Sequence, residues 1–121
     1  MRNFRKLTVW QKSMDLFVEI YRISNLLPSE ERFNLIVQIR KDVVSISSNI
    51  AEGSSRSTDL HFKKFLEDAI GSAFELESQL IGTSLVYPNL KTSIEKVYPL
   101  LNEIQRMLNA FIEKLKVGGR G

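Results

Sequence analysis

The fold can be inferred from residues 33–53, which read FNLIVQIRKDVVSISSNIAEG. The apolar residues of this segment recur every three or four positions, the spacing of a helix that buries one face. The series is Phe33, Ile36, Ile39, Val43, Ile46 and Ile50. A cap at Ser29, followed by the acidic residues Glu30 and Glu31, predicts the start of the helix, and Gly53 predicts its end. We therefore expect a helix over residues 30–52.

Three further segments show the same apolar period, over residues 8–26, 58–86 and 91–117. Pro28, Gly53 and Pro88 separate the four segments, and no window has the strict alternation of a half-buried strand. Ser57, Thr58 and Asp59 are equally good caps for the third helix. Four long helices with short connections predict an all-α protein, an antiparallel up-down-up-down four-helix bundle. The length of 121 residues fits a single domain over residues 1–121, with a flexible tail at 118–121.

The last of the four helices contains Pro99 within its apolar pattern. A proline in a helix interior removes a hydrogen bond and costs about 3 kcal/mol. Either the straight helix begins near Tyr98 or it is kinked there.

The residue inventory argues against an enzyme. The chain has no cysteine and one histidine, His61, which excludes thiol nucleophiles, cysteine metal sites and a pair of histidine ligands from one chain. The Glu-x-x-His motif of di-iron bundles, a serine–histidine triad and a Gly-rich phosphate loop are also missing. We therefore expect no catalytic residues, no metal and no cofactor.

The sequence gives no sign of a membrane protein. The basic start of the chain leads into the polar run Trp10-Gln11-Lys12-Ser13 rather than an apolar signal segment. No apolar run is long enough to span a bilayer. We expect a cytoplasmic protein.

Basic residues are concentrated at the two ends of the sequence. Residues 1–12 and 114–121 hold seven basic residues and no acidic one, whereas residues 13–113 hold ten basic and 14 acidic residues. In an up-down-up-down bundle both chain ends lie beside the loop between the second and third helices. This predicts a basic pole, and a basic pole fits nucleic-acid phosphates. Its candidate contact residues are Arg2, Arg5, Lys6, Lys12, Arg56, Lys63, Lys64, Lys114 and Lys116, with Arg120 beyond them.

Two charged residues, Arg40 and Glu77, fall inside apolar arcs of their helices. A buried charge must be paired or reach solvent. The two could pair with each other, although their heights along the helices differ, so the pair could instead cross a subunit boundary. Glycine in a helix also suggests close approach by another backbone, here at Gly71 and Gly82. Further polar candidates for structural or interface roles are Asn49, Glu52 and Glu75.

The first two predicted helices have apolar faces wider than one core requires. Val9, Leu16 and Ile20 form one stripe of the first helix, and Trp10 and Phe17 belong to a second stripe beside it. We expect the excess apolar surface to be covered by self-association.

The chain resembles a known family of bacterial bundle proteins. The resemblance is carried by Gln38-Ile39-Arg40-Lys41, Ser45-Ile46 and Ser48-Asn49-Ile50-Ala51-Glu52-Gly53. This pattern is similar to that of the proteins encoded in intervening sequences of 23S rRNA genes. That family resembles in turn the accessory variability protein of diversity-generating retroelements, a homopentamer that binds nucleic acid and a reverse transcriptase.

The resemblance implies a homo-oligomer, with a pentamer suspected, that has no established catalytic activity and a nucleic-acid partner. Asp42, Val43 and Ser47 depart from the family pattern, and Asp42 lowers the positive charge of the second helix. We therefore assign nucleic-acid binding, of RNA in the first place, to the basic pole. The alternative is a protein-binding adaptor module without nucleic-acid contact.

Overall fold

The computed structural model describes residues 2–118. Five α-helices are found there: α1 (Thr8–Ser24), α2 (Leu35–Ser54), α3 (Asp59–Val86), α4 (Lys91–Glu95) and α5 (Tyr98–Gly118). Short 3-10 helices occupy Phe4–Lys6 (η1), Ser29–Glu31 (η2) and Pro88–Leu90 (η3). The prediction of an all-helical chain is confirmed over this range. The predicted tail lies outside the described residues apart from Gly118, and so does Arg120.

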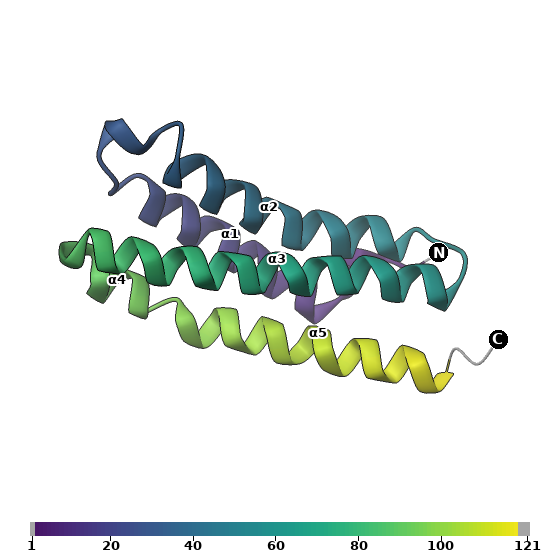
Figure 1. Cartoon of the computed structure of the whole chain (residues 1–121). Helices are drawn as coiled ribbons and strands as arrows, with labels where there is room; N and C mark the ends of the chain where they lie inside the picture. The colour runs from purple at the N-terminus through teal and green to yellow at the C-terminus, as the bar shows by residue number, and fades with distance from the viewer. Residues whose placement is uncertain (1, 119–121) are drawn as a thin grey trace.

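The four long helices lie side by side in alternating directions (Figure 1). Helix α2 packs against α1 and α3, and α5 packs against α3 and α1. The core lies between them and is fully buried. Its largest side chains are Leu16, Ile20, Ile39, Ile46, Ile50, Phe62, Leu66, Leu76, Leu80, Ile94, Leu101 and Ile104. None of the described helices is long and apolar enough to cross a membrane.

The predicted helix over 91–117 is wrong as one piece, because it is divided into α4 and α5. In a continuous helix the nitrogen of Pro99 would have to bond to the carbonyl oxygen of Glu95, which proline cannot do. The break at residues 96–97 places Pro99 second in α5, where a backbone N–H would have no helical partner. Of the two alternatives left open by the sequence, the structure adopts a helix that begins at Tyr98.

Helix α2 begins five residues later than expected, because residues 29–31 form η2 and Asn34 has a non-helical backbone. Ser29 is the first residue of η2, and the N-cap position of this 3-10 helix is Pro28. Glu31 accepts a hydrogen bond from the hydroxyl of Tyr87 (2.5 Å), which raises the pKa of Tyr87 to about 12. This contact ties the connection between α1 and α2 to the end of α3.

Helix α3 shows which of its three candidate caps acts. The hydroxyl of Thr58 accepts a hydrogen bond from the backbone N–H of His61 (3.2 Å), so Thr58 is the N-cap. Asp59 lies in the first turn, where its charge favours the positive end of the helix. Helix α1 ends at Ser24, four residues before Pro28.

Candidate nucleic-acid interface

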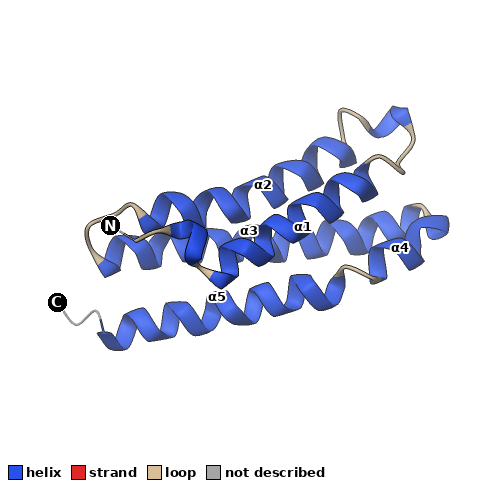
Figure 2. Cartoon of the chain, turned by 180° about the vertical axis from the view of Figure 1, so that it is seen from behind, coloured by secondary structure: helices blue, strands red, loops and turns tan. Residues whose placement is uncertain are grey.

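Three parts of the chain meet at one end of the molecule, which we call the α2–α3 end and define as residues 2–6, 54–64 and 111–116. The backbone N–H of Arg2 donates to the carbonyl oxygen of Ser54 (3.2 Å), and its guanidinium pairs with Asp59. The rings of Phe62 and Phe111 are 5.1 Å apart and join the start of α3 to the end of α5. Figures 1 and 2 show both chain ends on this side.

Much of the basic charge at this end is paired with neighbouring carboxylates. Besides Arg2 with Asp59, the pairs are Arg56–Glu52 (3.2 Å), Lys63–Glu67 (3.4 Å) and Lys116–Glu113 (3.1 Å). Four candidate contact residues are exposed and form no ion pair with another described residue: Arg5, Lys6, Lys64 and Lys114. At this end of the molecule, the positive charge that is free to meet phosphate is therefore concentrated in these four residues.

Lys12 lies away from the α2–α3 end, contrary to its predicted place in the basic pole. Its ammonium pairs with Glu103 (3.0 Å), in the second turn of α5. At 1.5 Å per residue, Glu103 is about 22 Å from the C-terminal end of that helix. Residues 2–7 lead from the α2–α3 end to the start of α1 at Thr8, so Lys12 lies nearer the middle of the molecule than its place among the basic residues 1–12 indicates.

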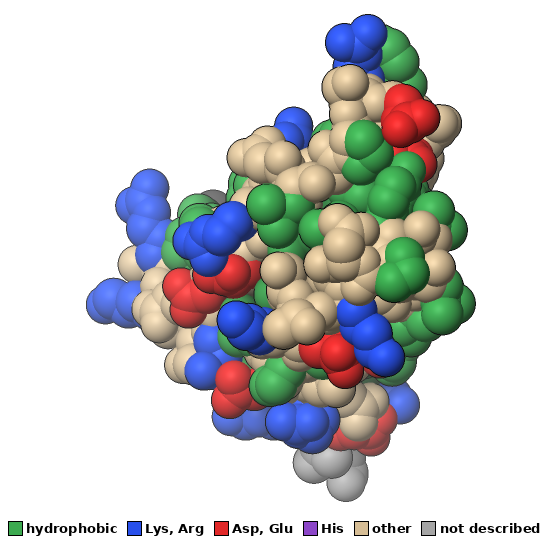
Figure 3. Space-filling view, turned by 90° about the vertical axis from the view of Figure 1, so that its left-hand side faces the viewer, with side chains coloured by type: hydrophobic (Ala, Val, Ile, Leu, Met, Phe, Trp, Pro, Cys, Tyr) green, Lys and Arg blue, Asp and Glu red, His purple; other side chains and the backbone are tan. Residues whose placement is uncertain are grey.

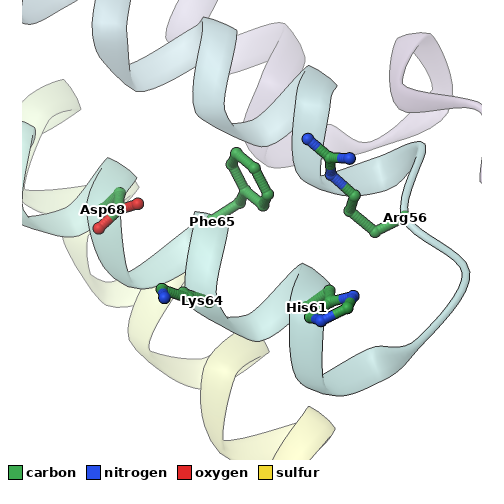
Figure 4. A pocket seen from close by; sticks show the side chains of 5 residues that line it. All are labelled: Arg56, His61, Lys64, Phe65 and Asp68. Atoms are coloured by element: carbon green, nitrogen blue, oxygen red, sulfur yellow. The ribbon is translucent and has the colours of Figure 1, made fainter.

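A hollow of about 300 Å³ opens beside the α2–α3 turn. Arg56 from the turn lines it together with His61, Lys64, Phe65 and Asp68 from α3 (Figure 4). The four α3 residues share one face because they are spaced i, i+3, i+4 and i+7. The guanidinium of Arg56 lies 4.8 Å from the ring centre of Phe65, in a cation–π contact. The hollow thus combines three basic side chains with an aromatic ring.

Gly53 allows α2 to approach this part of α3 closely. A Cβ at Gly53 would lie 2.6 Å from Cβ of Phe65 and 2.9 Å from Cδ1 of Phe62. The expectation that Gly53 follows the end of the helix is wrong, because α2 continues to Ser54 and no described glycine has a positive φ. Gly53 is needed for packing, and it determines where the ring of Phe65 lies.

Arg40 and Glu77 do not pair with each other in the chain. The guanidinium of Arg40 donates to Ser24 Oγ (2.8 Å) and Asn25 Oδ1 (2.9 Å) and lies 4.5 Å from the ring centre of Tyr21. Glu77 accepts a hydrogen bond from Gln105 Nε2 (2.9 Å). Each charged side chain therefore has its own polar partners on a neighbouring helix: Arg40 bonds to residues at the end of α1, and Glu77 bonds to a residue of α5.

Asp42 and its neighbours form a polar seam between α2 and α3, where the seam is defined as Asp42, Ser45, Asn49, Ser72 and Glu75. The hydroxyls of Ser45 and Ser72 are hydrogen bonded at 2.8 Å, and the Asn49 amide donates to the Ser45 carbonyl (2.9 Å). Asp42 is 2% exposed, and its Oδ2 has no hydrogen-bond partner. Burial, with a hydrogen bond and charge repulsion from Glu75, raises the pKa of Asp42 to about 7.

Several exposed apolar side chains lie on α3. The second stripes of α1 and α2, with Trp10, Phe17 and Val44, pack half-buried against the core. On α3, Phe74, Ile81 and Leu85 are exposed, and these residues together with Gly71 and Gly82 are called the outer face of α3. A Cβ at either glycine would meet nothing within 4 Å, so the close approach expected there is not made within the chain. Figure 3, seen from the opposite end, shows apolar side chains gathered along one side of the molecule.

Sequence reasoning did not single out His61 and Phe65 as members of a site. The sequence presents His61 only as a candidate metal ligand or member of a triad, and it raises no functional expectation for Phe65. The signal that could have found them is the spacing of His61, Lys64, Phe65 and Asp68 on one helix face. Among residues 2–118 no three histidine or acidic side chains lie close enough together to hold a metal ion.

The chain matches the family model described as 23S rRNA-intervening sequence protein, over residues 5–110. The matched range includes the last two residues of η1 and the helices α1 to α4, together with more than half of α5. No curated protein shows a significant match to the chain.

Proposed function

We propose that this chain, which belongs to the 23S rRNA-intervening sequence protein family, is a non-catalytic RNA-binding protein that acts as a homo-oligomer. Its structural unit is an up-down-up-down four-helix bundle of α1, α2, α3 and α5. The observation that carries the proposal is the set of four exposed cations at the α2–α3 end that form no ion pair within residues 2–118: Arg5, Lys6, Lys64 and Lys114.

Four such cations can bind phosphates without reading sequence. A lysine or arginine that contacts a phosphate releases counterions, so affinity falls as salt rises. Ion-paired residues such as Lys63 contribute less, because their carboxylate partners must first be displaced. Binding therefore depends on the shape and charge of the nucleic acid, and DNA competes with RNA wherever both present phosphates at a similar spacing.

The test measures the affinity of a structured RNA as a function of salt concentration. The variant replaces Lys6, Lys64 and Lys114 with alanine, and the matched control replaces Arg32, Lys91 and Lys96, which are exposed on the segments connecting the other helices. We expect the first variant to flatten the log–log salt dependence and the control to retain it. A salt slope near zero for the natural chain, or an equal loss in both variants, contradicts the proposal.

We propose that self-association uses the outer face of α3 rather than the faces of α1 and α2. Phe74 is 56% exposed and Leu85 is 76% exposed, a large apolar surface to leave in water. Gly71 and Gly82 leave room for a neighbouring helix. The family resemblance implies a pentamer. We expect light scattering to give an oligomer for the natural chain and a monomer for Phe74→Ser with Leu85→Ser.

The alternative function is a protein-binding adaptor, in which the outer face of α3 contacts a different protein. The same exposed residues favour it, and oligomeric state separates the two proposals. A chain that is monomeric at micromolar concentration and binds RNA without salt dependence supports the adaptor.

A further inference from the structure

We infer that the hollow lined by Arg56, His61, Lys64, Phe65 and Asp68 binds one unpaired nucleotide of a single-stranded nucleic acid. The inference rests on the proposed function and adds to it a specific subsite and a preference for single strands. The phosphate lies among the three basic side chains, and the base lies against Phe65 and the guanidinium stacked on it.

The phosphate side of the hollow is defined by charge. Lys64 is exposed and forms no ion pair with another described residue, so its ammonium is available. Arg56 shares its guanidinium with Glu52 at 3.2 Å and keeps further N–H groups free to donate. His61 is exposed at the first turn of α3. The hydroxyl of Thr58 already occupies the backbone N–H of His61, so the ring is the group that His61 offers.

The base side of the hollow is defined by an aromatic ring and an acid. Phe65 is half-buried, and the guanidinium of Arg56 lies 4.8 Å from its ring centre, so the two planar groups offer stacking surfaces to a base. Asp68 lies seven residues from His61, about 10 Å along the helix. Its carboxylate repels a second phosphate and accepts a hydrogen bond from the amino group of a base.

The shape of the hollow favours single strands over duplexes. A base in a duplex is stacked between its neighbours and does not offer its flat face to a side chain, whereas an unpaired base does. Phe65 lines the hollow beside Arg56 (Figure 4), and a base that stacks on its ring must turn out of the strand. Gly53 fixes this arrangement, because the Cβ of Phe65 sits in the space that a side chain at residue 53 would occupy.

The test compares a short fluorescent single-stranded RNA with its duplex, by anisotropy, for the natural chain and for three variants. His61→Ala and Lys64→Ala remove the phosphate contacts, and Phe65→Leu removes the ring while keeping an apolar side chain against Gly53. The matched controls are Lys91→Ala and Phe33→Leu, which remove an exposed cation and an exposed ring elsewhere.

We expect each pocket variant to lower the single-strand affinity, for Phe65→Leu by about fivefold or more, and to change the duplex affinity less. If Phe65→Leu does not fold, the single-strand affinities of His61→Ala and Lys64→Ala still test the proposal, because both residues are exposed. If RNA binding depends on salt but the variants lose equal affinity for single strand and duplex, the proposed nucleotide subsite is wrong and the proposed function still stands. Loss of all salt-dependent binding in the natural chain overturns both. Adenosine monophosphate binding as tightly as the oligomer shows a free-nucleotide site and overturns the assignment to a strand.

Discussion

A methyl group at residue 53 would lie within 3 Å of both Phe62 and Phe65, much closer than a Cβ tolerates. We predict that Gly53→Ala lowers the free energy of unfolding by about 1–3 kcal/mol, because α2 and α3 must move apart. Chemical denaturation measures the change. Gly71→Ala is the matched control: a Cβ there meets nothing, and alanine favours the helix by up to about 1 kcal/mol. Equal effects of the two substitutions would contradict the packing role of Gly53.

The buried carboxyl of Asp42 makes stability depend on pH. Its pKa of about 7 in the folded chain exceeds the ordinary value of 3.8, so between these values the folded state holds a proton that the unfolded state lacks. Stability from this group is therefore greatest below pH 4 and is lost as pH rises through 7. We predict that Asp42→Asn raises the free energy of unfolding at pH 8 by about 2 kcal/mol.

The control for this prediction is Asp15→Asn, which changes an exposed carboxyl on α1. Denaturation across the range from pH 4 to pH 8 gives the comparison. A parallel pH dependence in Asp42→Asn and the natural chain would show that another group is responsible. The seam contains Glu75 as well, and Glu75→Gln should reduce the same dependence by removing the repulsion.

The sequence identified Arg40 and Glu77 as charges that need partners, but it did not identify the partners. Both side chains lie where the helical period places them. Their actual partners, Ser24 and Asn25 for Arg40 and Gln105 for Glu77, depend on the rotation and height of neighbouring helices. A single helix pattern does not contain that information.

At the scale of elements, substitutions at Pro99 distinguish a helix that begins at Tyr98 from a longer helix that is kinked there. Because Pro99 is second in α5, its missing N–H costs nothing, and we predict that Pro99→Ala changes the free energy of unfolding by less than about 1 kcal/mol. Asn109→Pro, at an exposed position in the middle of α5, should cost about 3 kcal/mol or more. A large stabilisation on replacing Pro99 would contradict the observed helix start.

The interiors of the helices could be predicted from the apolar period of the sequence, whereas several helix ends could not. The predicted core positions on α2, such as Ile39 and Ile46, are fully buried, because the period reports directly on burial. The start of α2 was misplaced because Ser29 and Glu30 resemble a cap, while Glu31 is bound by Tyr87 from the far end of α3. The cap of α3 required three-dimensional geometry to choose Thr58 among neighbours with similar side chains.

At the scale of the whole molecule, acidic residues at the α2–α3 end pair with several of its cations, and under the proposed function these pairs weaken nucleic-acid binding. We predict that Glu67→Gln strengthens RNA binding at low salt by about twofold to fivefold, because Lys63 is freed to contact a phosphate. Glu95→Gln, an exposed acid on α4, is the control. Equal strengthening by both substitutions would indicate a general effect of net charge rather than release of Lys63.

The candidate interface could be predicted in outline from the sequence. Alternating helix directions bring both chain ends to the loop between α2 and α3, so the gathering of Arg2, Arg56 and Lys114 follows from topology. The ion pair between Lys63 and Glu67 could also be predicted, because residues four apart on a helix are neighbours. The position of Lys12 was not predictable, because the sequence does not show how far residues 2–7 extend along the bundle before α1 begins.

The contact between Arg2 and Asp59 also bears on the order in which the chain folds. It joins residues 57 apart in the sequence, whereas α2 and α3 are connected by a turn of only four residues, 55–58. Short loops close faster and at a lower entropic cost than long ones. We therefore expect α2 and α3 to pair early and the N-terminal segment to dock late, so that the α2–α3 end is completed in the last step of folding.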